Sequence, residues 1–350
     1  MNILFTCAGR RNYLLQYFRD ALSGTGKIIG VDSDINATAL QEVDVAREVP
    51  SVHEEDYIDS VLQVCVDNNV SGIFSLNDIE LPILVANRGK FTDEGVALFI
   101  SGSEIIDICS DKVKTAKFLM ENGFHTPKTF VNLEDAIGAI ENGSLAFPLI
   151  VKPRWGSASI GIRRVNSNRE LELAFQYTLG LVSESVLAKV GQIGRLSEER
   201  VTDGGSVIVQ EWIDGEEYGL DVLNDLAGNF NSVYCKRKMG MRAGETDRAI
   251  LVDSSELESM GRRLGETLGH IGNLDVDVFK SNADGRYLVL EMNPRFGGGY
   301  PFSHELGARY PQALLAWAAS KSFDTSIQTK SFNKIISKCE RLIEIRHPEM

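Results

Sequence analysis

Short apolar runs alternate with amphipathic stretches through the first hundred residues of the chain. Residues 3–7 are apolar and end in a turn at Ala8-Gly9, and the segment that follows repeats apolar residues at helical spacing. This alternation of strand and helix predicts a parallel sheet with helices on both faces. The further predicted strands are 27–34, 43–50, 70–76 and 96–101, and the further predicted helices are 57–69 and 80–91.

Polar side chains follow the predicted strands, and in a parallel sheet these carboxyl ends share the edge at which ligands bind. A single glycine, Gly9, stands where a dinucleotide-binding fingerprint needs three, so a nicotinamide-dependent oxidoreductase is the weaker interpretation. Arg10 and Arg11 face either a ligand or solvent, and the pattern alone leaves both open. The strand-end residues are Arg10, Arg11, Asp32, Asp34, Asn77, Asp78 and Glu80.

The pattern changes after residue 108. Asp111 is placed to cap a helix that ends at Gly123. Two strands then flank a Gly/Ser-rich loop at 156–161, and a strand that breaks at Asp214-Gly215 follows. Residues 274–294 predict a hairpin that turns at 282–285. The stretch 175–205 is ambiguous between helix and loop.

Composition narrows the class of protein. The 350 residues carry 36 basic and 49 acidic side chains, a net charge of −13, which disfavours binding to nucleic acid. No apolar run is long enough to cross a bilayer. The five cysteines are widely spaced and form no C-x-x-C pair, as expected of a reduced, cytoplasmic protein without structural zinc.

Three segments occur in a fixed order: "VKPRWGSASIG" with Lys152 before the glycine loop, "QEWIDGEEY", and "LDVDVF…LEMNPR". Together they resemble the ATP-grasp superfamily, and most of all one synthetase half of the carbamoyl phosphate synthetase large subunit. The resemblance covers roughly residues 1–320. It implies an α/β fold with an N-terminal parallel pre-ATP-grasp domain and then a two-lobed α+β ATP-grasp fold. The implied boundaries are 1–108 for the first domain, 109–205 for the small lobe, 206–325 for the C-terminal lobe and 326–350 for a tail.

The resemblance also implies how ATP is bound. Two lysines would reach the α- and β-phosphates, a flexible glycine loop would cover them, and a hinge strand would offer its backbone to the adenine, with one glutamate on the ribose hydroxyls. Because the hinge uses backbone atoms, its assignment does not depend on side-chain identity. The implied residues are Lys112, Lys152, Gly156, Ser157, Ser159, Gln210, Glu211, Trp212, Ile213 and Glu217.

A metal site follows from the hairpin. Glu291 and Asn293 are two apart on one strand and therefore share a face. The resemblance supplies Asp277 from the partner strand as a further ligand, while Asp275 is a same-face competitor. Carboxylate and amide oxygens are the ligands that Mg²⁺ prefers, so we expect Mg²⁺ or Mn²⁺ there.

Cations are expected around the reacting groups. The resemblance implies that Arg295 stabilises charge as an acyl phosphate forms, and that Gly297–Gly299 leave room for the reacting end of the substrate. In the basic stretch "CKRKMGMR" we favour Lys236 and Arg242 for a cleft role, although the register of this strand cannot be fixed from sequence. His304 is an alternative acid or base, or a packing residue.

The resulting prediction is an ATP-dependent carboxylate–amine ligase that works through an acyl phosphate, with a small carboxylic acid and an amine or ammonia as substrates. The acid is expected near Arg10, Asn77 and Asp78. Two alternatives are a non-catalytic ATP-binding or regulatory subunit and a carbamoyl-phosphate-synthetase-like subunit. A homodimer is an open alternative to a monomer, and neither a nucleic acid nor a membrane is expected as a partner.

Overall fold

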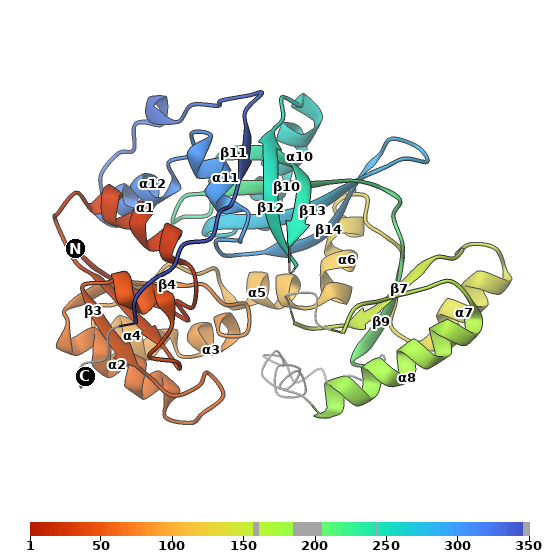
Figure 1. Ribbon diagram of the computed structural model, residues 1–350, viewed down its shortest axis with the longest axis horizontal. Coiled ribbons are helices and arrows are strands. Elements are labelled where there is room, and N and C mark those ends of the chain that lie inside the picture. Colours follow the sequence, from red (N-terminus) through yellow and green to blue (C-terminus); the bar gives the residue numbers. More distant parts are fainter. Residues whose placement is uncertain (157–160, 185–204, 243, 346–350) are drawn as a thin grey trace.

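A computed structural model of the chain describes residues 1–156, 161–184, 205–242 and 244–345. Three sheets organise it, of five, six and four strands. Figure 1 shows the N-terminal domain on one side, the six-stranded sheet in the centre and the four-stranded lobe on the other side. The α/β first part and the mixed remainder match the predicted fold class.

The first sheet is parallel throughout, in the order β3-β2-β1-β4-β5. Its central strands are almost wholly apolar because both faces are covered by helices. One face packs on α1 and the other on α2, so that alternate residues of β1 enter two separate cores, Phe5 in one and Leu4 in the other. The elements are β1 (Asn2–Thr6), α1 (Asn12–Leu22), β2 (Ile28–Asp32), β3 (Val45–Glu48), α2 (Tyr57–Asp67), β4 (Val70–Ser75) and β5 (Ala97–Leu98).

The prediction of one helix over 80–91 was wrong, since two short helices occupy this stretch, α3 (Leu81–Ala86) and α4 (Arg88–Asp93). The side chain of Asn87 donates to the carbonyl of Ile83, competing with the backbone ladder at the break. Arg88 then turns to donate to the carbonyls of Leu98 and Ile100, which holds α4 against the edge of the sheet.

The small lobe is an antiparallel sheet in the order β6-β9-β7-β8, covered by two helices. The predicted cap of the preceding helix is confirmed: the Asp111 carboxylate accepts from the backbone N–H groups of Val113 and Lys114, and Gly123 has a positive φ after the last turn. The elements are α5 (Ser103–Ser110), α6 (Lys112–Glu121), β6 (Thr129–Phe130), α7 (Leu133–Glu141), β7 (Leu149–Pro153), β8 (Arg163–Val165), α8 (Asn168–Glu184) and β9 (Val207–Glu211).

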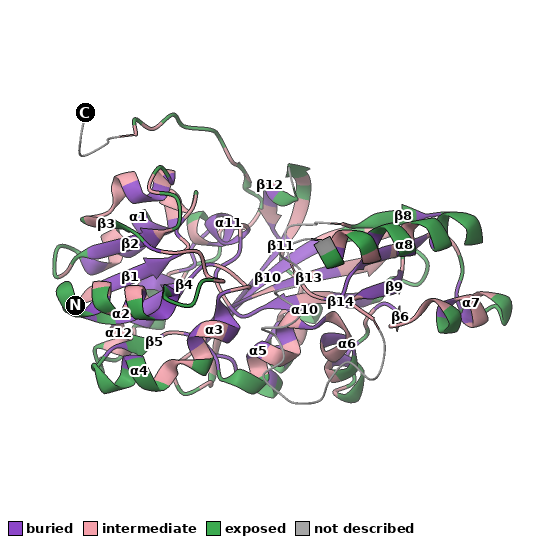
Figure 2. Cartoon of the chain, turned by 90° about the horizontal axis from the view of Figure 1, so that it is seen from below, coloured by how far each residue is buried: buried purple, intermediate pink, exposed green. Residues whose placement is uncertain are grey.

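The six-stranded sheet is antiparallel, in the order β14-β13-β10-β11-β12-β15. One face packs on α10, and the strands of this sheet are largely buried along their inner segments (Figure 2). The hairpin predicted at 274–294 is confirmed as β13 and β14. The elements are β10 (Gly215–Asn224), β11 (Phe230–Arg242), β12 (Glu245–Leu251), α10 (Ser255–Leu268), β13 (Gly272–Ser281), β14 (Tyr287–Asn293), α11 (Tyr300–Glu305), α12 (Tyr310–Ala318) and β15 (Ile335–Ser337).

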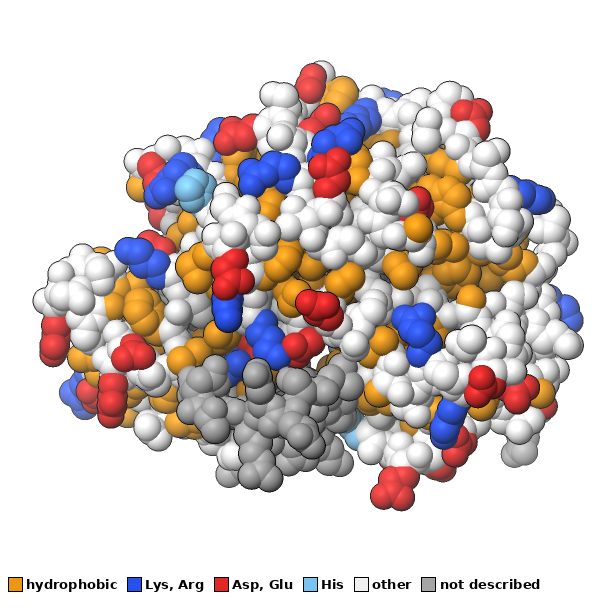
Figure 3. Space-filling model, turned by 180° about the vertical axis from the view of Figure 1, so that it is seen from behind, with side chains coloured by type: hydrophobic (Ala, Val, Ile, Leu, Met, Phe, Trp, Pro, Cys, Tyr) orange, Lys and Arg blue, Asp and Glu red, His pale blue; other side chains and the backbone are white. Residues whose placement is uncertain are grey.

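The C-terminal tail adds the edge strand β15 to β12 and then runs toward the first domain (Figure 1). Arg341 pairs with Glu42 of that domain, so the tail contacts both the six-stranded sheet and the first domain. Basic and acidic side chains are interspersed over the face shown in Figure 3. Among the helices that the structure describes, none has the length and apolar character needed to cross a bilayer.

Candidate active site

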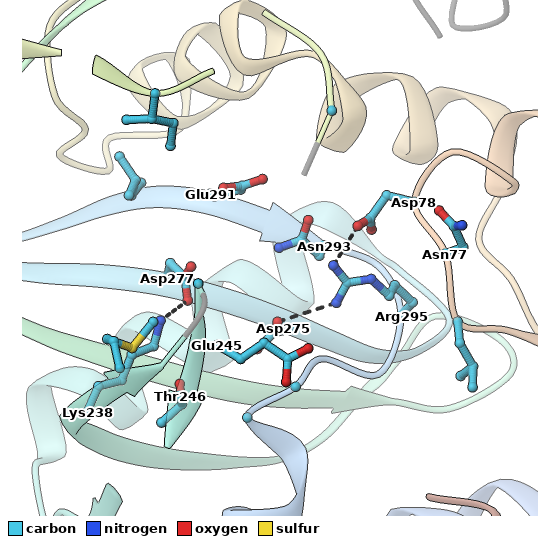
Figure 4. A pocket seen from close by; sticks show the side chains of 18 of the residues that line it. Asn77, Asp78, Lys238, Glu245, Thr246, Asp275, Asp277, Glu291, Asn293 and Arg295 are labelled. Carbon is cyan, nitrogen blue, oxygen red and sulfur yellow. Dashed lines mark hydrogen bonds and ion pairs between the residues drawn. The ribbon is translucent and has the colours of Figure 1, made fainter. Parts of the chain in front are cut away.

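A cavity of about 540 Å³ lies where the three sheets meet. The first domain lines it with Arg10, Asn77 and Asp78, the small lobe with Lys152, and the six-stranded sheet with most of the remaining charged side chains. Figure 4 shows side chains from the first domain and from the six-stranded sheet converging on this space. The labelled residues are Asn77, Asp78, Lys238, Glu245, Thr246, Asp275, Asp277, Glu291, Asn293 and Arg295.

Two lysines stand together at the small-lobe side of the cavity, as predicted. Lys112 begins α6 and donates to the carbonyl of Gly156 at 2.7 Å, while Lys152 lies near the end of β7 and is 4% exposed. The two elements are joined by a buried ion pair, since the Arg154 guanidinium binds the Asp111 carboxylate at 2.7–2.9 Å. Burial, and then the charge of Lys112, lower the pKa of Lys152 to about 8. Two cations held this close favour an anion between them.

Four oxygen-bearing side chains face the cavity from β13 and β14. Asp277 lies opposite Glu291, and Asp275 lies opposite Asn293. Directly opposed residues of an antiparallel pair project to the same face. The register shifts between Asp277 and Val278, which leaves Leu290 as an extra residue on β14, and both Leu290 and Glu291 reach the cavity as a result. The predicted ligands are therefore brought together, and Asp275 joins them.

This donor set fits a hard divalent cation. Burial, and then the charges of Asp277 and Asp221, raise the pKa of Asp275 to about 6, although Arg295 opposes the shift. Such mutual repulsion between carboxylates is what a divalent cation relieves. Within the described residues, no three His, Cys, Asp or Glu side chains form a ready metal cluster. Asp275, Asp277 and Glu291 share one face of the hairpin and line the same cavity without forming such a cluster, and the predicted set adds the amide oxygen of Asn293.

Two lysines of the basic strand β11, Lys236 and Lys238, line the cavity but bind different partners. Lys236 is 0% exposed, and its ammonium pairs with the buried carboxylate of Asp221 at 2.5 Å. Its side chain therefore forms part of the cavity wall and does not project into the cavity. The side chain of Lys238, two residues on and on the same face, binds Glu217 at 2.6 Å and Asp277 at 2.7 Å. Gly219 on the neighbouring strand makes room for both, since a Cβ there would stand 3.2 Å from the Cε of Lys236.

Arg242 is not brought to the site. It lies on the surface at the end of β11, where its guanidinium pairs with Glu340 of the tail at 2.8 Å and its side chain is 67% exposed. Register explains the difference from the prediction. The pairing of β11 with β12 shifts around Gly240, so the alternation of faces that sequence spacing assumes does not continue to Arg242.

Arg295 enters the cavity just after β14. Its guanidinium donates to Asp78 of the first domain at 2.6 Å and lies 3.5 Å from Asp275 (Figure 4). Burial alone would lower the pKa of Arg295, but the two carboxylates raise it above its ordinary value, so this side chain stays charged. A fixed, charged and planar donor suits a phosphoryl or carboxylate oxygen.

Charged side chains from other parts of the chain pack closely against the three glycines that follow Arg295 and Phe296. A Cβ on Gly297 would stand 1.9 Å from the Asp275 carboxylate, and one on Gly299 would stand 2.8 Å from Lys236. A Cβ on Gly298 would stand 3.0–3.2 Å from the side chains of Glu245 and Arg11. These glycines allow charged side chains to close around the cavity. Gly298 and Gly299 also line it, and the expectation that they leave room for substrate stays a prediction.

The segment predicted as the adenine hinge, residues 210–213, covers the end of β9 and the break before β10. Glu217 lines the cavity, but the hinge residues Gln210–Ile213 are not among the described residues that do so. The Gln210 side chain donates to Thr129 and is buried, while Trp212 is 37% exposed beneath the guanidinium of Arg164. Ser157 and Ser159 of the predicted phosphate loop lie outside the described residues.

His304 is a packing residue. Its ring stacks on Tyr17 at 3.6 Å and its Nδ1 lies 3.1 Å from the hydroxyl of Tyr300. Burial, followed by the charge of Arg309, lowers the pKa of His304 to about 3, so the ring is neutral near pH 7. The predicted strand-end arginines do reach the cavity: Arg10 is exposed at its edge, and Arg11 lies in its wall.

Sequence reasoning missed two members of the site. The sequence leaves open which of Lys236, Arg237 and Lys238 faces the cleft, and the strand position of Lys238, two residues from Lys236, is a signal for it. Glu245 also lines the cavity, and it pairs with Arg11 at 3.5 Å and with Lys338 of the tail at 3.0 Å. It follows a loop and carries no recognisable motif.

Comparison with known protein families gives two matches along the chain. Residues 3–99 match the family described as "PylC-like, N-terminal domain", and residues 109–299 match the "ATP-grasp domain". The second match spans more than half of the chain and includes both the lysine pair and the β13–β14 carboxylates. The chain therefore belongs to the ATP-grasp family, which confirms the predicted resemblance.

Curated relatives are about a quarter identical to the chain over the aligned residues. It is 26% identical over 234 residues to a coenzyme gamma-F420-2:alpha-L-glutamate ligase of Methanococcus maripaludis, a match covering 63% of this chain and 72% of the relative. It is 26% identical to a D-alanine–D-alanine ligase of Pseudomonas entomophila, over 57% of this chain and 58% of the relative. A carbamoyl phosphate synthase large chain of Mesorhizobium japonicum is 25% identical, over 59% of this chain and 18% of its own length. These ligases confirm the predicted enzyme class.

Solved structures share the fold. A biotin carboxylase from Campylobacter jejuni superposes with a TM-score of 0.71 at 16% identity, over 95% of this chain and 74% of its own. An L-amino acid ligase from Bacillus licheniformis superposes with a TM-score of 0.68 at 22% identity, over 93% and 78% of the two chains. The order of a parallel domain followed by the two-lobed remainder is thus common to all three.

Proposed function

We propose that the chain is an ATP-dependent carboxylate–amine ligase that activates its acid as an acyl phosphate. The observation that carries the proposal is the placement of two kinds of group around one cavity. Lys112 at the start of α6 and Lys152 on the small-lobe strand β7 line it, together with the Asp277–Glu291–Asn293 face of the β13–β14 hairpin. A polyphosphate with its metal needs cations on one side and oxygen ligands on the other.

In this assignment the lysine pair binds the phosphates, and Glu217 accepts from the ribose. Asp277, Glu291 and Asn293 would hold Mg²⁺ or Mn²⁺, which supplies charge neutralisation at the transferring phosphoryl group. Lys238 bridges Glu217 and Asp277 and so links the ribose and metal sides. Binding of the metal would compete with this ammonium for one oxygen of Asp277.

The reaction would take place in two steps. A carboxylate oxygen of the acid attacks the γ-phosphorus of ATP, and ADP leaves. The amine nitrogen then attacks the acyl carbon, the bond to the phosphate oxygen breaks, and the amine gives up a proton. Arg295 is placed to stabilise the charge that develops on the phosphoryl and carbonyl oxygens, because it is buried and charged at the cavity.

The acid would lie on the first-domain side, near Arg10 and Asn77. Two of the relatives named above act on glutamate or alanine according to their names, so amino acids are the first acids and amines to test. The panel should pair each acid with each amine, with ammonia and with no amine.

The decisive experiment is release of ADP from Mg·ATP across that panel, repeated with hydroxylamine in place of the amine. An acyl phosphate is trapped by hydroxylamine as an acyl hydroxamate, which forms only with the correct acid. We expect ADP release that depends on the acid and a hydroxamate in equal amount. Tight binding of Mg·ATP with no release for any acid would instead favour the non-catalytic ATP-binding subunit.

A further inference from the structure

The guanidinium of Arg295 is hydrogen-bonded to a residue of the first domain. Its Nη2 donates to the Asp78 carboxylate at 2.6 Å, across 217 positions of sequence, whereas its contact with Asp275 is 3.5 Å long. A contact of 3.5 Å is a weak hydrogen bond, and one of 2.6 Å is a strong, charge-assisted one. Asp78 is therefore the principal partner of this guanidinium, and Figure 4 shows Arg295 lying between the two carboxylates.

Hydrogen bonds of its neighbours Asn77 and Glu80 hold the loop that carries Asp78 in place. The Asn77 carboxamide oxygen accepts from the backbone N–H of Ile79 at 3.0 Å, which closes a turn around Asp78. Glu80, two residues on, is 0% exposed and anchors the loop in the first domain. Three hydroxyl groups donate to its carboxylate at 2.5–2.7 Å, namely those of Thr6, Tyr57 and Ser75.

An arginine needs such support if it is to act at one point in space. Its side chain has about 2 kcal/mol of rotamer entropy to lose when it is held. The side chain of Arg295 is only 10% exposed, so water does little to compensate its charge, and a buried charge without a partner is costly. Asp78 solves both problems, because its carboxylate fixes the direction of the guanidinium and balances its charge.

We propose that Asp78 is a positioning residue by which the first domain aims Arg295 at the reacting phosphoryl and acyl groups. The inference rests on the proposed function and deepens it. It also sharpens the expected role of Asp78, because the sequence predicts only that the acid lies near this residue. The first domain then contributes to the chemical step as well as to substrate binding.

Two other roles for Asp78 give different kinetics. A direct contact to substrate would raise KM for the acid and leave kcat nearly unchanged. A purely structural contact between domains would lower the melting temperature and weaken Mg·ATP binding while leaving kcat nearly unchanged. A positioning role predicts a lower kcat with the KM for ATP close to the wild-type value. Asp78→Ala lowers the melting temperature in either case, because it leaves the buried charge of Arg295 without its main partner, so kcat decides between the two roles.

The kinetic test compares Asp78→Ala and Asp78→Asn with the wild type, using the acid found in the panel above. We expect kcat to fall about ten- to a hundredfold for Asp78→Ala, the usual size of effect for a group that orients a functional side chain. Asp78→Asn keeps the shape and loses the charge, so its loss should be smaller. Asp59→Asn is the matched control, because it breaks the exposed Lys90–Asp59 pair of the same domain, and it should not change kcat.

A second measurement tests the positioning without any turnover. In ¹⁵N NMR spectra of the arginine side chains, a fixed guanidinium gives separate signals for its two Nη groups, and the Arg295→Lys variant identifies those of Arg295. We expect separate signals in the wild type and a single averaged signal in Asp78→Ala. Unchanged Arg295 signals in both Asp78 variants would overturn the inference, even if the ligase activity were established. If no acid supports turnover, the proposed function fails while this measurement still decides the role of Asp78.

Discussion

The two ends of the cavity are built on different principles. At the small-lobe end, Lys112 and Lys152 stand close together, and the pKa of Lys152 is lowered. At the first-domain end, Arg295 is matched by a close carboxylate from Asp78. In the first arrangement, two neighbouring ammonium groups repel each other, and a bound polyanion would relieve this repulsion. In the second arrangement, a carboxylate holds the guanidinium in place before any ligand binds. The comparison suggests that nucleotide binding is driven at one end and that chemistry is prepared at the other.

The largest effect should come from the hairpin that lies between the two ends. Glu291→Ala removes a carboxylate that faces both the lysine pair and Arg295, and we expect ADP formation to fall at least about a hundredfold, as when a charge-stabilising group is removed from an active site. The melting temperature should change little, because Glu291 is only half-buried at a cavity wall. Turnover near the wild-type rate would contradict the metal assignment. Glu172→Ala, on the exposed side of α8, is the control.

The nucleotide end is tested by Lys152→Ala. A hydrogen bond to a charged group contributes about 1.5–3 kcal/mol, so affinity for Mg·ATP should fall roughly ten- to a hundredfold, measured by calorimetry. Lys321→Ala changes an exposed lysine beyond α12 and should leave the affinity unchanged. Equal losses in both variants would show that Lys152 does not contact the phosphates.

The lowered pKa of Lys152 adds a dependence on pH. The ammonium form binds phosphate, and in the unliganded protein it loses its proton as pH rises through about 8. Binding must then take up a proton, so the affinity for Mg·ATP should decrease above pH 8, by at most about tenfold per pH unit. Titrations between pH 7 and 9.5 in two buffers would reveal the proton uptake. Lys152→Arg stays charged in this range and should show a flatter profile, and a flat wild-type profile would rule out this role.

The smallest effect is expected outside the cavity, at Arg242. Its pair with Glu340 is exposed on both sides, and exposed pairs of this kind contribute about 0–1 kcal/mol. Arg242→Ala should therefore change turnover less than about twofold and leave the melting temperature nearly unaltered. A loss comparable to that of Glu291→Ala would restore Arg242 to the site and place the end of β11 over the cavity.

The two ends were also unequally predictable. Lys112, Lys152 and the Glu291–Asn293 pair stand in short motifs whose chemistry is local, and the structure brings all four to one cavity. The partner of Arg295 could not be found in this way. Asp78 stands in a loop after β4, and no local pattern relates it to a residue 217 positions away.

Strand register was the second obstacle. Alternation predicts that Lys236, Lys238 and Arg242 share a face, but the shifts around Gly240 take Arg242 to the surface. Burial then distinguishes Lys236 from Lys238. The ammonium of Lys236 pairs with the buried carboxylate of Asp221, and Gly299 packs against its side chain. The extra residue at Leu290 likewise depends on how β14 pairs with β13.

By itself, the sequence determined most of the order of the strands and helices, the cap at Asp111 and the β13–β14 hairpin. It also determined that oxygen-bearing side chains stand at the end of that hairpin. Those features depend on apolar periodicity and on residues a few positions apart, which act within one element. Only the tertiary structure decided which lysine opens into the cavity and which carboxylate holds Arg295. Both outcomes depend on contacts between distant elements, and the energy of a buried charge is set by whatever partner the fold places beside it.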